Sequence, residues 1–359
     1  MRIHQICARL QQGDAITSNV LNLHRTFLSW GLESHVYAHD EDPRVAHNNE
    51  GEDLYRRKFL REKGDLLLYH YSVYNENHRL FLRSRNRKIL VYHNITPPRF
   101  FAPYSRQIAS FCERGIRLLP RLRDCDFAWG DSDFNRRDLV QAGFPPERTG
   151  VMPIYMDFSY LTEESPGMTA RLRDGRWNIL FVGRLVPNKR VDELLRFFVY
   201  YHHMVNPNSR LMVIGASWLD SYTRELWDIV EKYRLAGSVM LPGGSLGVSD
   251  RDLTSCYRSA DLFMTMSEHE GFCVPLVESM REGLPIMAYE AAAVPETLGG
   301  CGILFRRNNF PCLAEAVEEL RLNASFREGI VAGEKRRFQQ FEPQEMERRL
   351  RELLAPYLS

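Results

Sequence analysis

Two glutamates separated by seven residues, Glu270 and Glu278, stand in the stretch EHEGFCVPLVE at 268–278. The apolar run DLFMTMS before it (261–267) predicts a buried strand. The proline at 275 predicts the start of a helix, because proline is tolerated in a first helical turn. Glu270 then lies in the loop and Glu278 about one turn inside the helix. A carboxylate has only acceptor sites, so each of the two can bind neighbouring hydroxyl groups.

The start of this predicted helix has the properties of an anion site. The backbone N–H groups of Cys273 and Val274 have no partner within the helix and lie at its positive end, which suits a phosphate. A ligand with phosphate in the middle and hydroxyls on both sides is a nucleotide sugar. The alternative interpretation is a solvated glutamate at a helix start and an unrelated second glutamate.

A second group of polar residues stands in NILFVGRLVPNKRVDELL, at 178–195. Here a predicted strand leads through Gly183 into a loop with Arg184 and Lys189, and a helix follows. Two cations at a strand end could clamp a diphosphate and stabilise the charge that builds on it as it leaves. The alternative is a basic surface turn capped by Asp192.

Short apolar, β-branched runs alternate with helix-period segments along the whole chain. This pattern predicts an α/β protein with parallel sheets that are covered on both faces. In such sheets ligands bind beyond the carboxyl ends of the strands, where the residues above would lie. The predicted strands cover 2–8, 66–72, 89–95, 126–132, 178–184, 210–215, 261–267 and 285–290.

The length of 359 residues exceeds what one hydrophobic core usually serves, so two domains are expected. The polar segment LTEESPGMTARLRDGRW at 161–177 marks the boundary between them. We expect two Rossmann-like, doubly wound domains, 1–165 and 166–341, which face a central cleft. The C-terminal amphipathic helix, 342–358, is long enough to pack against either domain.

The charge is divided unevenly along the chain. The net charge of +1 gives no reason to expect nucleic acid as a partner, but residues 1–150 hold 23 Lys and Arg against 18 Asp and Glu. Much of this excess lies in YRRKFLREK (55–63) and RLFLRSRNRK (79–88). Such stretches are typical of solvated helix faces, and the alternative is a patch that rests on anionic lipid.

The sequence shows no membrane span and no cysteine framework. No apolar run approaches the roughly 20 residues of a spanning helix, and the N-terminus lacks a signal-peptide pattern. We therefore expect a cytoplasmic protein, with peripheral contact at the inner face of the membrane as the alternative. The seven cysteines include no CxxC pair, so they are expected to be reduced and mostly buried.

The motifs together resemble the C-terminal half of family 4 glycosyltransferases, which are retaining enzymes of the GT-B fold. The resemblance rests on FVGRLVPNKRVDELL, on VIG, and on CYRSADLFMTMSEHEGFCVPLVESMREGLPIMAYEAAAVPETLGGCGILF, and it covers about 177–306. It implies that Glu270 faces the donor sugar and that Glu278 binds the ribose hydroxyls. Arg184 and Lys189 would then neutralise the diphosphate.

The same resemblance implies main-chain contacts to the donor. Phe272, Cys273 and Val274 would contact the sugar and the phosphate through their backbones. The base would lie at the strand end from about Met240 to Gly243.

The N-terminal half is similar to the same family in outline. The stretch QQGDAITSNV keeps Gly13, whose backbone would lie close to the diphosphate, and an ordinary strand-to-helix turn is the alternative. Asp14 stands where a second glycine is frequent, and it is expected to orient an acceptor hydroxyl. His93 in LVYHNITPP matches the family histidine that reaches the donor sugar, with Asn94 beside it on the acceptor side, whereas most lone histidines at strand ends are structural. His70 has no partner at ligand spacing and is assigned no role.

The reaction implied is retaining transfer of a sugar from a nucleotide diphosphate to a hydroxyl of a glycan or a lipid-linked glycan. The runs GDAITSNVLNLHRTFLSWGLESHVYA, YHNITPPRFFAPY and GDSDFNRRDL resemble bacterial transferases that build surface polysaccharides, several of which use GDP-mannose. No metal or other cofactor is expected, because fixed cations would stabilise the leaving group. The DSD at 131–133 is interpreted as the cap of a helix.

Three alternatives differ in function. The first is a transferase that uses a UDP-sugar. The second is a catalytically silent subunit that binds nucleotide sugars within a glycosyltransferase complex. The third is a nucleotide-sugar epimerase of the same fold, and it is the weakest because those enzymes do not use this pair of glutamates.

Overall fold

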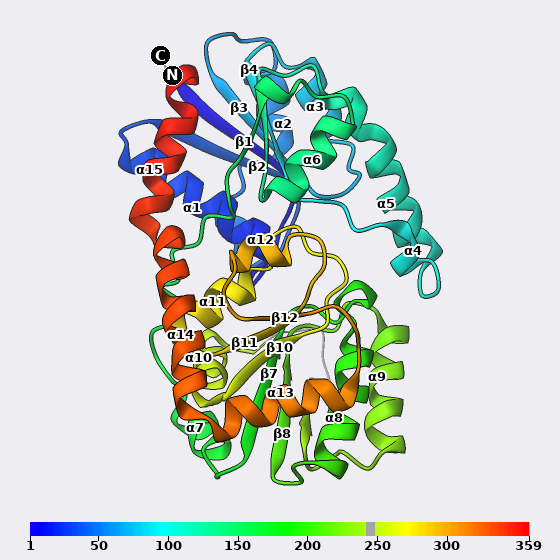
Figure 1. The fold of residues 1–359 in the computed structure, drawn as a ribbon. Helices are drawn as coiled ribbons and strands as arrows, with labels where there is room; N and C mark the ends of the chain where they lie inside the picture. Colours follow the sequence, from blue (N-terminus) through cyan, green and yellow to red (C-terminus); the bar gives the residue numbers. More distant parts are fainter. Residues whose placement is uncertain (242–247, 359) are drawn as a thin grey trace. The chain divides into compact units, whose positions relative to one another are not determined.

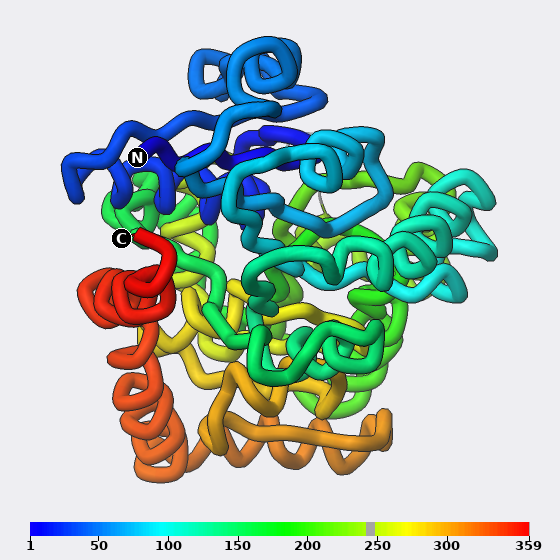
Figure 2. Tube along the Cα trace, turned by 90° about the horizontal axis from the view of Figure 1, so that it is seen from above, coloured from blue at the N-terminus to red at the C-terminus, as the bar shows by residue number. Residues whose placement is uncertain are grey.

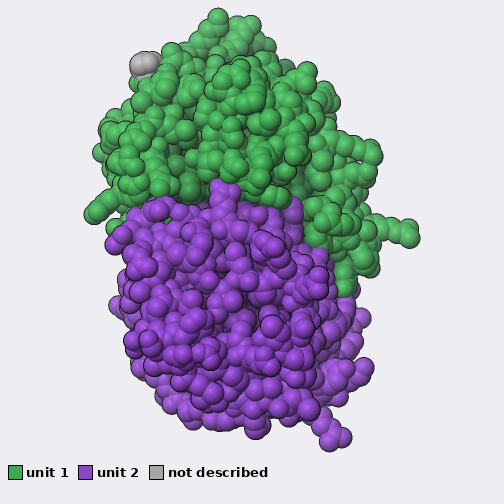
Figure 3. Space-filling view, viewed as in Figure 1, with its two compact units in different colours: residues 1–157, 341–359 green, residues 158–340 purple. Residues whose placement is uncertain are grey.

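The structure is a computed structural model that describes residues 1–241 and 248–358. It divides into two compact units, Met1–Asp157 with Phe341–Ser359 and Phe158–Gln340, which Figure 3 colours separately. Each unit is a parallel sheet covered by helices, so the predicted α/β class with two Rossmann-like units is confirmed. No helix among the described residues is both long enough and apolar enough to cross a bilayer.

Unit 1 contains a six-stranded parallel sheet in the order β2-β1-β3-β4-β5-β6. Its strands are β1 (Arg2–Leu10), β2 (Glu33–Glu41), β3 (Leu66–Tyr71), β4 (Arg87–Tyr92), β5 (Phe127–Gly130) and β6 (Thr149–Val151). Its helices are α1 (Ala15–Ser29), α2 (Glu52–Lys58), α3 (His78–Arg83), α4 (Pro98–Phe101), α5 (Arg106–Leu118), α6 (Asp133–Gln141) and α15 (Pro343–Leu354).

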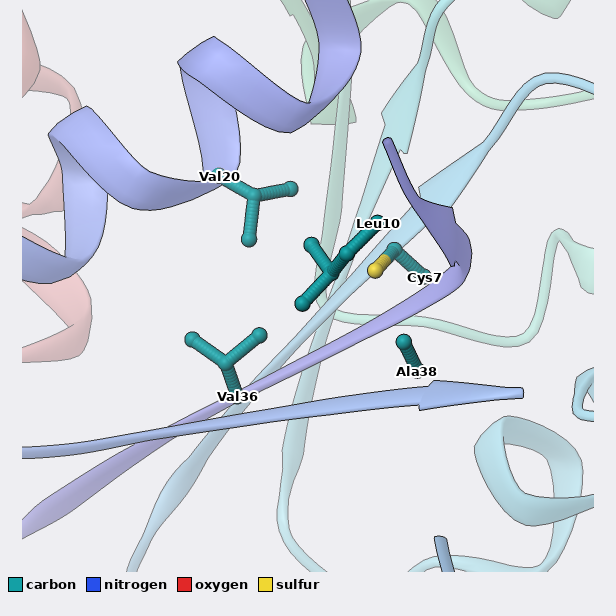
Figure 4. Packing of buried hydrophobic residues seen from close by; sticks show 5 residues of the cluster. All are labelled: Cys7, Leu10, Val20, Val36 and Ala38. Atoms are coloured by element: carbon teal, nitrogen blue, oxygen red, sulfur yellow. The ribbon is translucent and has the colours of Figure 1, made fainter. Parts of the chain in front are cut away.

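The packing of α1 on the first two strands fixes the turn that follows β1. Figure 4 shows Val20 of α1 above Cys7 and Leu10 of β1 and above Val36 and Ala38 of β2, all of them buried. With α1 held against the end of β1, the chain must reverse within a few residues. Glycine allows this reversal, because the φ angle of 75° at position 13 lies in the left-handed region.

Unit 2 contains a second six-stranded parallel sheet, in the order β12-β11-β10-β7-β8-β9. Its strands are β7 (Trp177–Val182), β8 (Ser209–Ile214), β9 (Val239–Met240), β10 (Leu262–Thr265), β11 (Ile286–Tyr289) and β12 (Ile303–Phe305). Its helices are α7 (Pro166–Leu172), α8 (Val191–Met204), α9 (Asp220–Lys232), α10 (Asp250–Ser259), α11 (Val274–Glu282), α12 (Val294–Leu298), α13 (Phe310–Leu322) and α14 (Ala324–Phe338).

The order of the second sheet reverses where β7 and β10 lie side by side. Figure 1 shows α8 and α9 on one side of this sheet and α10 and α11 on the other. The helices that follow β7 and β10 therefore leave toward opposite faces, and the loops after both strands meet at one edge. This is the position where open parallel sheets bind ligands.

Short 3-10 helices complete the chain. They are η1 (Ala46–Asn48), η2 (Leu119–Leu122), η3 (Pro146–Arg148), η4 (Pro187–Lys189), η5 (Gln339–Phe341) and η6 (Ala355–Tyr357). Of these, η4 matters for the site, because it lies in the loop after β7.

The boundary between the units falls after Asp157, so the sequence-based boundary at 165 is corrected. The segment in between packs on unit 2 through several hydrogen bonds. Arg258 donates to the carbonyl oxygen of Leu161 at 3.4 Å, and the backbone N–H of Ser165 donates to that of Arg251 at 3.2 Å. The polar composition of this segment reflects hydrogen bonding to α10 and does not mark a linker.

The C-terminal helix α15 belongs to unit 1. The indole N–H of Trp30 donates to the carboxylate of Glu347 at 2.7 Å, and the guanidinium of Arg351 lies 4.2 Å from the Trp30 ring centre. Accordingly the red end of the chain lies near the blue N-terminus in Figure 1 and Figure 2.

All seven cysteines are free and five are buried, as predicted.

Candidate functional site

The loops after β7 and β10 are joined by one backbone and one side-chain hydrogen bond. The N–H of Glu268 donates to the carbonyl oxygen of Asn188 at 2.9 Å, and the amide of Asn188 donates to the carbonyl oxygen of His269 at 2.9 Å. Arg190, which has a left-handed backbone (φ 50°), forms ion pairs with Glu268 and with Asp192. The two loops therefore form one connected edge of unit 2.

Lys189 and Glu270 meet at this edge. The ammonium nitrogen of Lys189 donates to both carboxylate oxygens of Glu270, at 2.5 and 2.6 Å. The Glu270 side chain is 7% exposed and that of Lys189 is 16% exposed. Each carboxylate oxygen keeps at least one further acceptor position, so a fixed Glu270 can still bind a hydroxyl. The sequence assigned these residues to different parts of a ligand, and the structure places them in direct contact.

Arg184 is the exposed cation of the same edge. Its guanidinium lies 5.6 Å from the ring centre of Trp218, and no carboxylate of the described chain forms an ion pair with it. The preceding Gly183 has a φ angle of 154°, and a Cβ at Gly215 would lie only 2.0 Å from the carbonyl oxygen of Gly183. Glycines therefore allow β7 and β8 to end close together, and Arg184 follows directly in the loop after β7.

Helix α11 starts without a side-chain cap. Its N-cap residue is Cys273, in a left-handed conformation (φ 73°), and Pro275 stands in the first turn as predicted. The carbonyl oxygen of Phe272 accepts from the hydroxyl of Thr297 at 2.6 Å, which holds the loop. Because no side chain caps the helix, the N–H of Val274 is a helix-terminal donor that an anion could use. Burial raises the pKa of the Cys273 thiol well above its usual value, so this thiol stays protonated.

Glu278 is held by two tyrosines. The hydroxyl of Tyr160 donates to one carboxylate oxygen and that of Tyr257 to the other, both at 2.5 Å. Glu278 is 5% exposed, and burial raises the pKa of its carboxyl above the ordinary value while the two hydroxyls act in the opposite direction. Sequence reasoning missed both tyrosines. A buried carboxylate needs donors, but nothing in the spacing of the sequence says which side chains supply them.

The predicted base-binding strand end lies at the edge of the second sheet. Met240 ends β9 and is half-buried beside Met212 of β8. Gly243 lies outside the described residues.

In unit 1, four buried side chains form a chain of hydrogen bonds. The Gln5 amide donates to the carbonyl oxygen of Val20 at 3.1 Å, so its oxygen faces Nε2 of His70, 2.9 Å away. His70 Nδ1 lies 2.9 Å from His93 Nε2, and His93 Nδ1 lies 3.0 and 3.1 Å from the oxygens of Asp131. Both ring nitrogens of His93 therefore have partners within unit 1.

His70 gains a role from its position in the sheet. Its ring lies parallel to that of His93, with centres 5.2 Å apart, because the two histidines lie near the ends of the neighbouring strands β3 and β4. Burial lowers the pKa of His70 well below its usual value, so the ring is neutral. A neutral His70 that donates to Gln5 must accept from His93. The sequence signal was present, since two consecutive predicted strands each end near a histidine.

The remaining predicted residues lie at turns of unit 1. Asp14 caps α1, accepting from the N–H groups of Ile16 and Thr17 at 3.1 Å each. Asn94 is buried, has a φ angle of 69°, and donates to Asn135 at 2.8 Å.

The cap predicted within 131–133 is present, with Ser132 as the residue that caps α6. Asp131 does not take part in it and faces His93 instead. Within residues 1–241 and 248–358, no three His, Cys, Asp or Glu side chains are placed to hold a metal ion. The metal-independent reaction stays a prediction.

The second unit matches a known family. The model of the family described as "Glycosyl transferases group 1" matches residues 169–337, which include the loops after β7 and β10. The O-antigen chain mannosyltransferase B of Escherichia coli is 23% identical over 69% of this chain and 69% of its own length. The GDP-mannose:cellobiosyl-diphosphopolyprenol alpha-mannosyltransferase of Xanthomonas campestris is 29% identical over 53% of this chain. The chain spans 48% of that relative's length.

The fold also matches over the whole chain. The crystal structure of Anabaena HepE in complex with UDP and glucose has a TM-score of 0.77 at 18% sequence identity, covering 99% of this chain and 100% of that one. At this identity the match concerns the fold. The predicted resemblance is thus confirmed: residues 169–337 match the glycosyl transferases group 1 domain, and the chain has the GT-B fold.

Proposed function

We propose that the chain transfers mannose from GDP-mannose, with retention at the anomeric carbon, to a hydroxyl of a glycan or lipid-linked glycan in the synthesis of a surface polysaccharide such as lipopolysaccharide. Unit 2 binds the donor and unit 1 the acceptor. The observation that carries this proposal is the joined edge after β7 and β10, where Arg184, the pair Lys189 and Glu270, and the uncapped start of α11 come together.

The polar groups of this edge suit a nucleotide diphosphate sugar. Arg184 and the N–H of Val274 offer donors to the diphosphate, and both stabilise the charge that develops on it as the sugar leaves. Glu270 accepts from sugar hydroxyls while the ammonium group of Lys189 holds its carboxylate in place. The chemistry needs no metal if these fixed cations and dipoles hold the leaving group. His93, whose ring is held by Asp131, would help to position the sugar.

Glu278 completes the donor site in this proposal. Its carboxylate is oriented by the hydroxyls of Tyr160 and Tyr257, and the remaining acceptor positions suit the two ribose hydroxyls of a nucleotide. The ribose recognition would therefore depend on a carboxylate whose direction is set by side chains from α10 and from the segment before α7.

The choice of donor and acceptor follows the relatives. Two of them are mannosyltransferases, and the name of one combines GDP-mannose with a diphosphopolyprenol acceptor. A UDP-sugar is the second candidate, favoured by the fold match to a UDP-bound structure. Free, mostly buried thiols fit a reaction in the cytoplasm, at the inner face of the membrane if the acceptor is a lipid. A silent sugar-binding subunit is a third candidate, although the complete set of polar groups argues for turnover.

A thermal-shift screen tests the proposal. The purified protein is heated with UDP, GDP, ADP and their common sugar conjugates, with and without EDTA, because a ligand that binds only the folded state raises the melting temperature. We expect GDP and GDP-mannose to raise it and EDTA to change nothing. A response to UDP alone would mean that the donor is a UDP-sugar and not GDP-mannose. No response to any nucleotide would contradict the donor site.

The anomeric outcome is tested on product. NMR of the glycoside formed from GDP-mannose should show the α configuration of the donor. A β product would contradict retention, and a donor that is bound but neither transferred nor hydrolysed would favour the silent subunit.

A further inference from the structure

A groove rich in arginine lies between α2 and α3 in unit 1, and we call it the α2–α3 groove. It has a volume of about 550 Å³. Arg56, Arg57 and Arg61 come from α2 and the turn after it, and Arg79 and Arg83 come from α3. The two helices lie next to each other in Figure 1. The buried side chains of Leu60 and Leu80 also line the groove.

The acidic residues of the groove balance only part of this charge. A carboxylate oxygen of Glu52 lies 3.4 Å from Nδ1 of His39, and Glu76 forms an ion pair with Arg79 at 2.9 Å. These are the two glutamates among the lining residues, against five arginines, so the groove has an excess of 5 − 2 = 3 positive charges with His39 neutral.

Three of the five arginines have no carboxylate partner. Within the described chain, Arg57 donates to the backbone carbonyl of Asp53, and neither it nor Arg61 or Arg83 forms an ion pair. Arg56 pairs with Asp53 at 2.8 Å, in an exposed contact worth little. Guanidinium groups gathered over apolar side chains repel one another, and an anion that accepts from several of them relieves this repulsion.

The structure separates these arginines from other basic residues of the same two stretches. Arg87 donates to the carbonyl oxygen of Tyr357 at 3.1 Å, and Lys88 lies over the ring of Phe81, so both have structural contacts. Two stretches that the sequence suggested as ordinary solvated helix faces thus converge on one concave site. A solvated face on a single helix would not collect arginines from two helices.

We propose that the α2–α3 groove binds a phosphate or diphosphate group carried by a lipid. The planar guanidinium presents paired donors that match phosphate oxygens, and several of them can hold one doubly charged group. This inference rests on the proposed function, in which a lipid-linked acceptor brings its diphosphate to unit 1. The other source of the same chemistry is the headgroup of an anionic phospholipid.

The experiment compares two triple variants of the full chain. The groove variant carries Arg57→Gln, Arg61→Gln and Arg83→Gln. The matched control carries Lys58→Gln, Lys63→Gln and Arg85→Gln, which removes the same number of charges from the same two stretches without touching the groove. Both are accepted only if their melting temperatures equal that of the parent protein.

Two probes distinguish the sources. Calorimetry measures binding of farnesyl diphosphate below its micelle concentration, and co-sedimentation measures binding to vesicles of equal parts phosphatidylglycerol and phosphatidylcholine. Because each charge-assisted contact contributes about tenfold in affinity, we expect the groove variant to bind at least one probe about tenfold or more weakly and the control to bind like the parent. Loss of diphosphate binding assigns the groove to the acceptor, and loss of vesicle binding alone assigns it to the phospholipid.

Equal binding by the two variants, or no binding of either probe by the parent, would overturn the proposal. The nucleotide thermal shift is measured on the same samples and reports unit 2. If the nucleotide shift persists while the groove result is negative, the groove inference fails and the proposed donor site stands. If the parent shows no nucleotide shift, the proposed function fails first.

Discussion

The first helices after two central strands, α1 in unit 1 and α11 in unit 2, begin in opposite ways. At α1, the carboxylate of Asp14 accepts from the N–H groups of Ile16 and Thr17. At α11, no side chain caps the start at Val274. The donors that could hold a phosphate are therefore occupied by the chain itself in unit 1 and are left for a ligand in unit 2.

The polar and charged side chains of the two units differ in the same way. In unit 1 the polar residues at the strand ends satisfy one another, from Gln5 through His70 and His93 to Asp131, and all are buried. In unit 2, Arg184 is exposed and has no carboxylate partner in the described chain. The polar groups of a closed network already bond to one another, whereas an exposed donor is available to bind a ligand. The comparison supports the proposal that the diphosphate of the donor binds in unit 2.

The largest effect is expected at the ion pair of unit 2. Replacing Glu270 by Gln removes a charged acceptor from the sugar and its partner from Lys189, and the transfer rate should fall about a thousandfold. Binding of the nucleotide diphosphate, which depends on other groups, should change little. Initial rates with the donor identified by thermal shift, and calorimetry with the free nucleotide, measure the two effects.

Glu268 supplies the matched control for this variant. It lies two residues before Glu270 in the same loop and pairs with Arg190. Glu268→Gln should keep most of the transfer rate. Equal losses in the two variants would mean that loop structure, and not contact with the sugar, explains the effect. A variant with both Glu270→Gln and Lys189→Met should regain stability but not transfer, since it removes the unpaired charge.

A second prediction concerns stability against pH in unit 2. Glu334 is fully buried in α14, accepts from the N–H of Ile286, and has one carboxylate oxygen without a partner. Burial raises its pKa to about 8. Because the folded pKa exceeds the unfolded value, the contribution of Glu334 to the free energy of unfolding is fully present below about pH 4.5. This contribution is lost as the pH rises through 8.

Glu334→Gln should therefore raise the free energy of unfolding at pH 8 by roughly 4 kcal/mol and change it little at pH 5. Urea unfolding at the two pH values measures this. The exposed Glu328, on the same helix, gives the control Glu328→Gln, which should be neutral at both. An equal gain at pH 5 would show that the effect is not the titration of Glu334.

A third prediction concerns unit 1, where the sign is opposite. The pKa of His70 is lowered by burial, so the folded state stays neutral while the unfolded state takes up a proton below about pH 6.5. The contribution of His70 to the free energy of unfolding is then fully present above pH 6.5. It is lost as the pH falls, at about 1.4 kcal/mol per pH unit for one histidine. His70→Gln should reduce this slope between pH 6.5 and 5 in urea unfolding, and the exposed His47→Gln should not. An unchanged slope would show that His70 is not the group that titrates.

The sequence predicts the elements of the site better than its contacts. The strands that end at Val182 and Thr265, and the helix that begins beside Pro275, follow from apolar runs and from a proline that fits only a first turn. These signals are local. They place Lys189 and Glu270 in loops but not against each other, because that contact depends on β7 and β10 being neighbours in the sheet.

What the sequence could not predict depends on contacts between distant segments. Tyr160 directly precedes the polar segment that suggested a domain boundary, and its hydrogen bond to Glu278, 118 residues away, links it to unit 2. Likewise His70 acquires its partner because parallel pairing of β3 and β4 aligns two strand ends. Hydrogen bonds of this kind follow from strand order and register, which no local pattern of residue types fixes.

The smallest expected effect separates the two tyrosines that hold Glu278. Tyr257 is fully buried, so Tyr257→Phe leaves a buried carboxylate oxygen without its donor, whereas water can replace the half-buried hydroxyl of Tyr160. Loss of a donor disfavours the ionised carboxylate and raises the pKa of Glu278 further. Nucleotide affinity, measured by calorimetry, should fall about tenfold at pH 6 for Tyr257→Phe and less for Tyr160→Phe. The loss should be smaller at pH 8, because a higher pH favours the ionised carboxylate. A purely structural role for Tyr257 would weaken binding equally at both pH values, so the ratio of the two affinities decides whether the hydroxyl acts through the charge of Glu278.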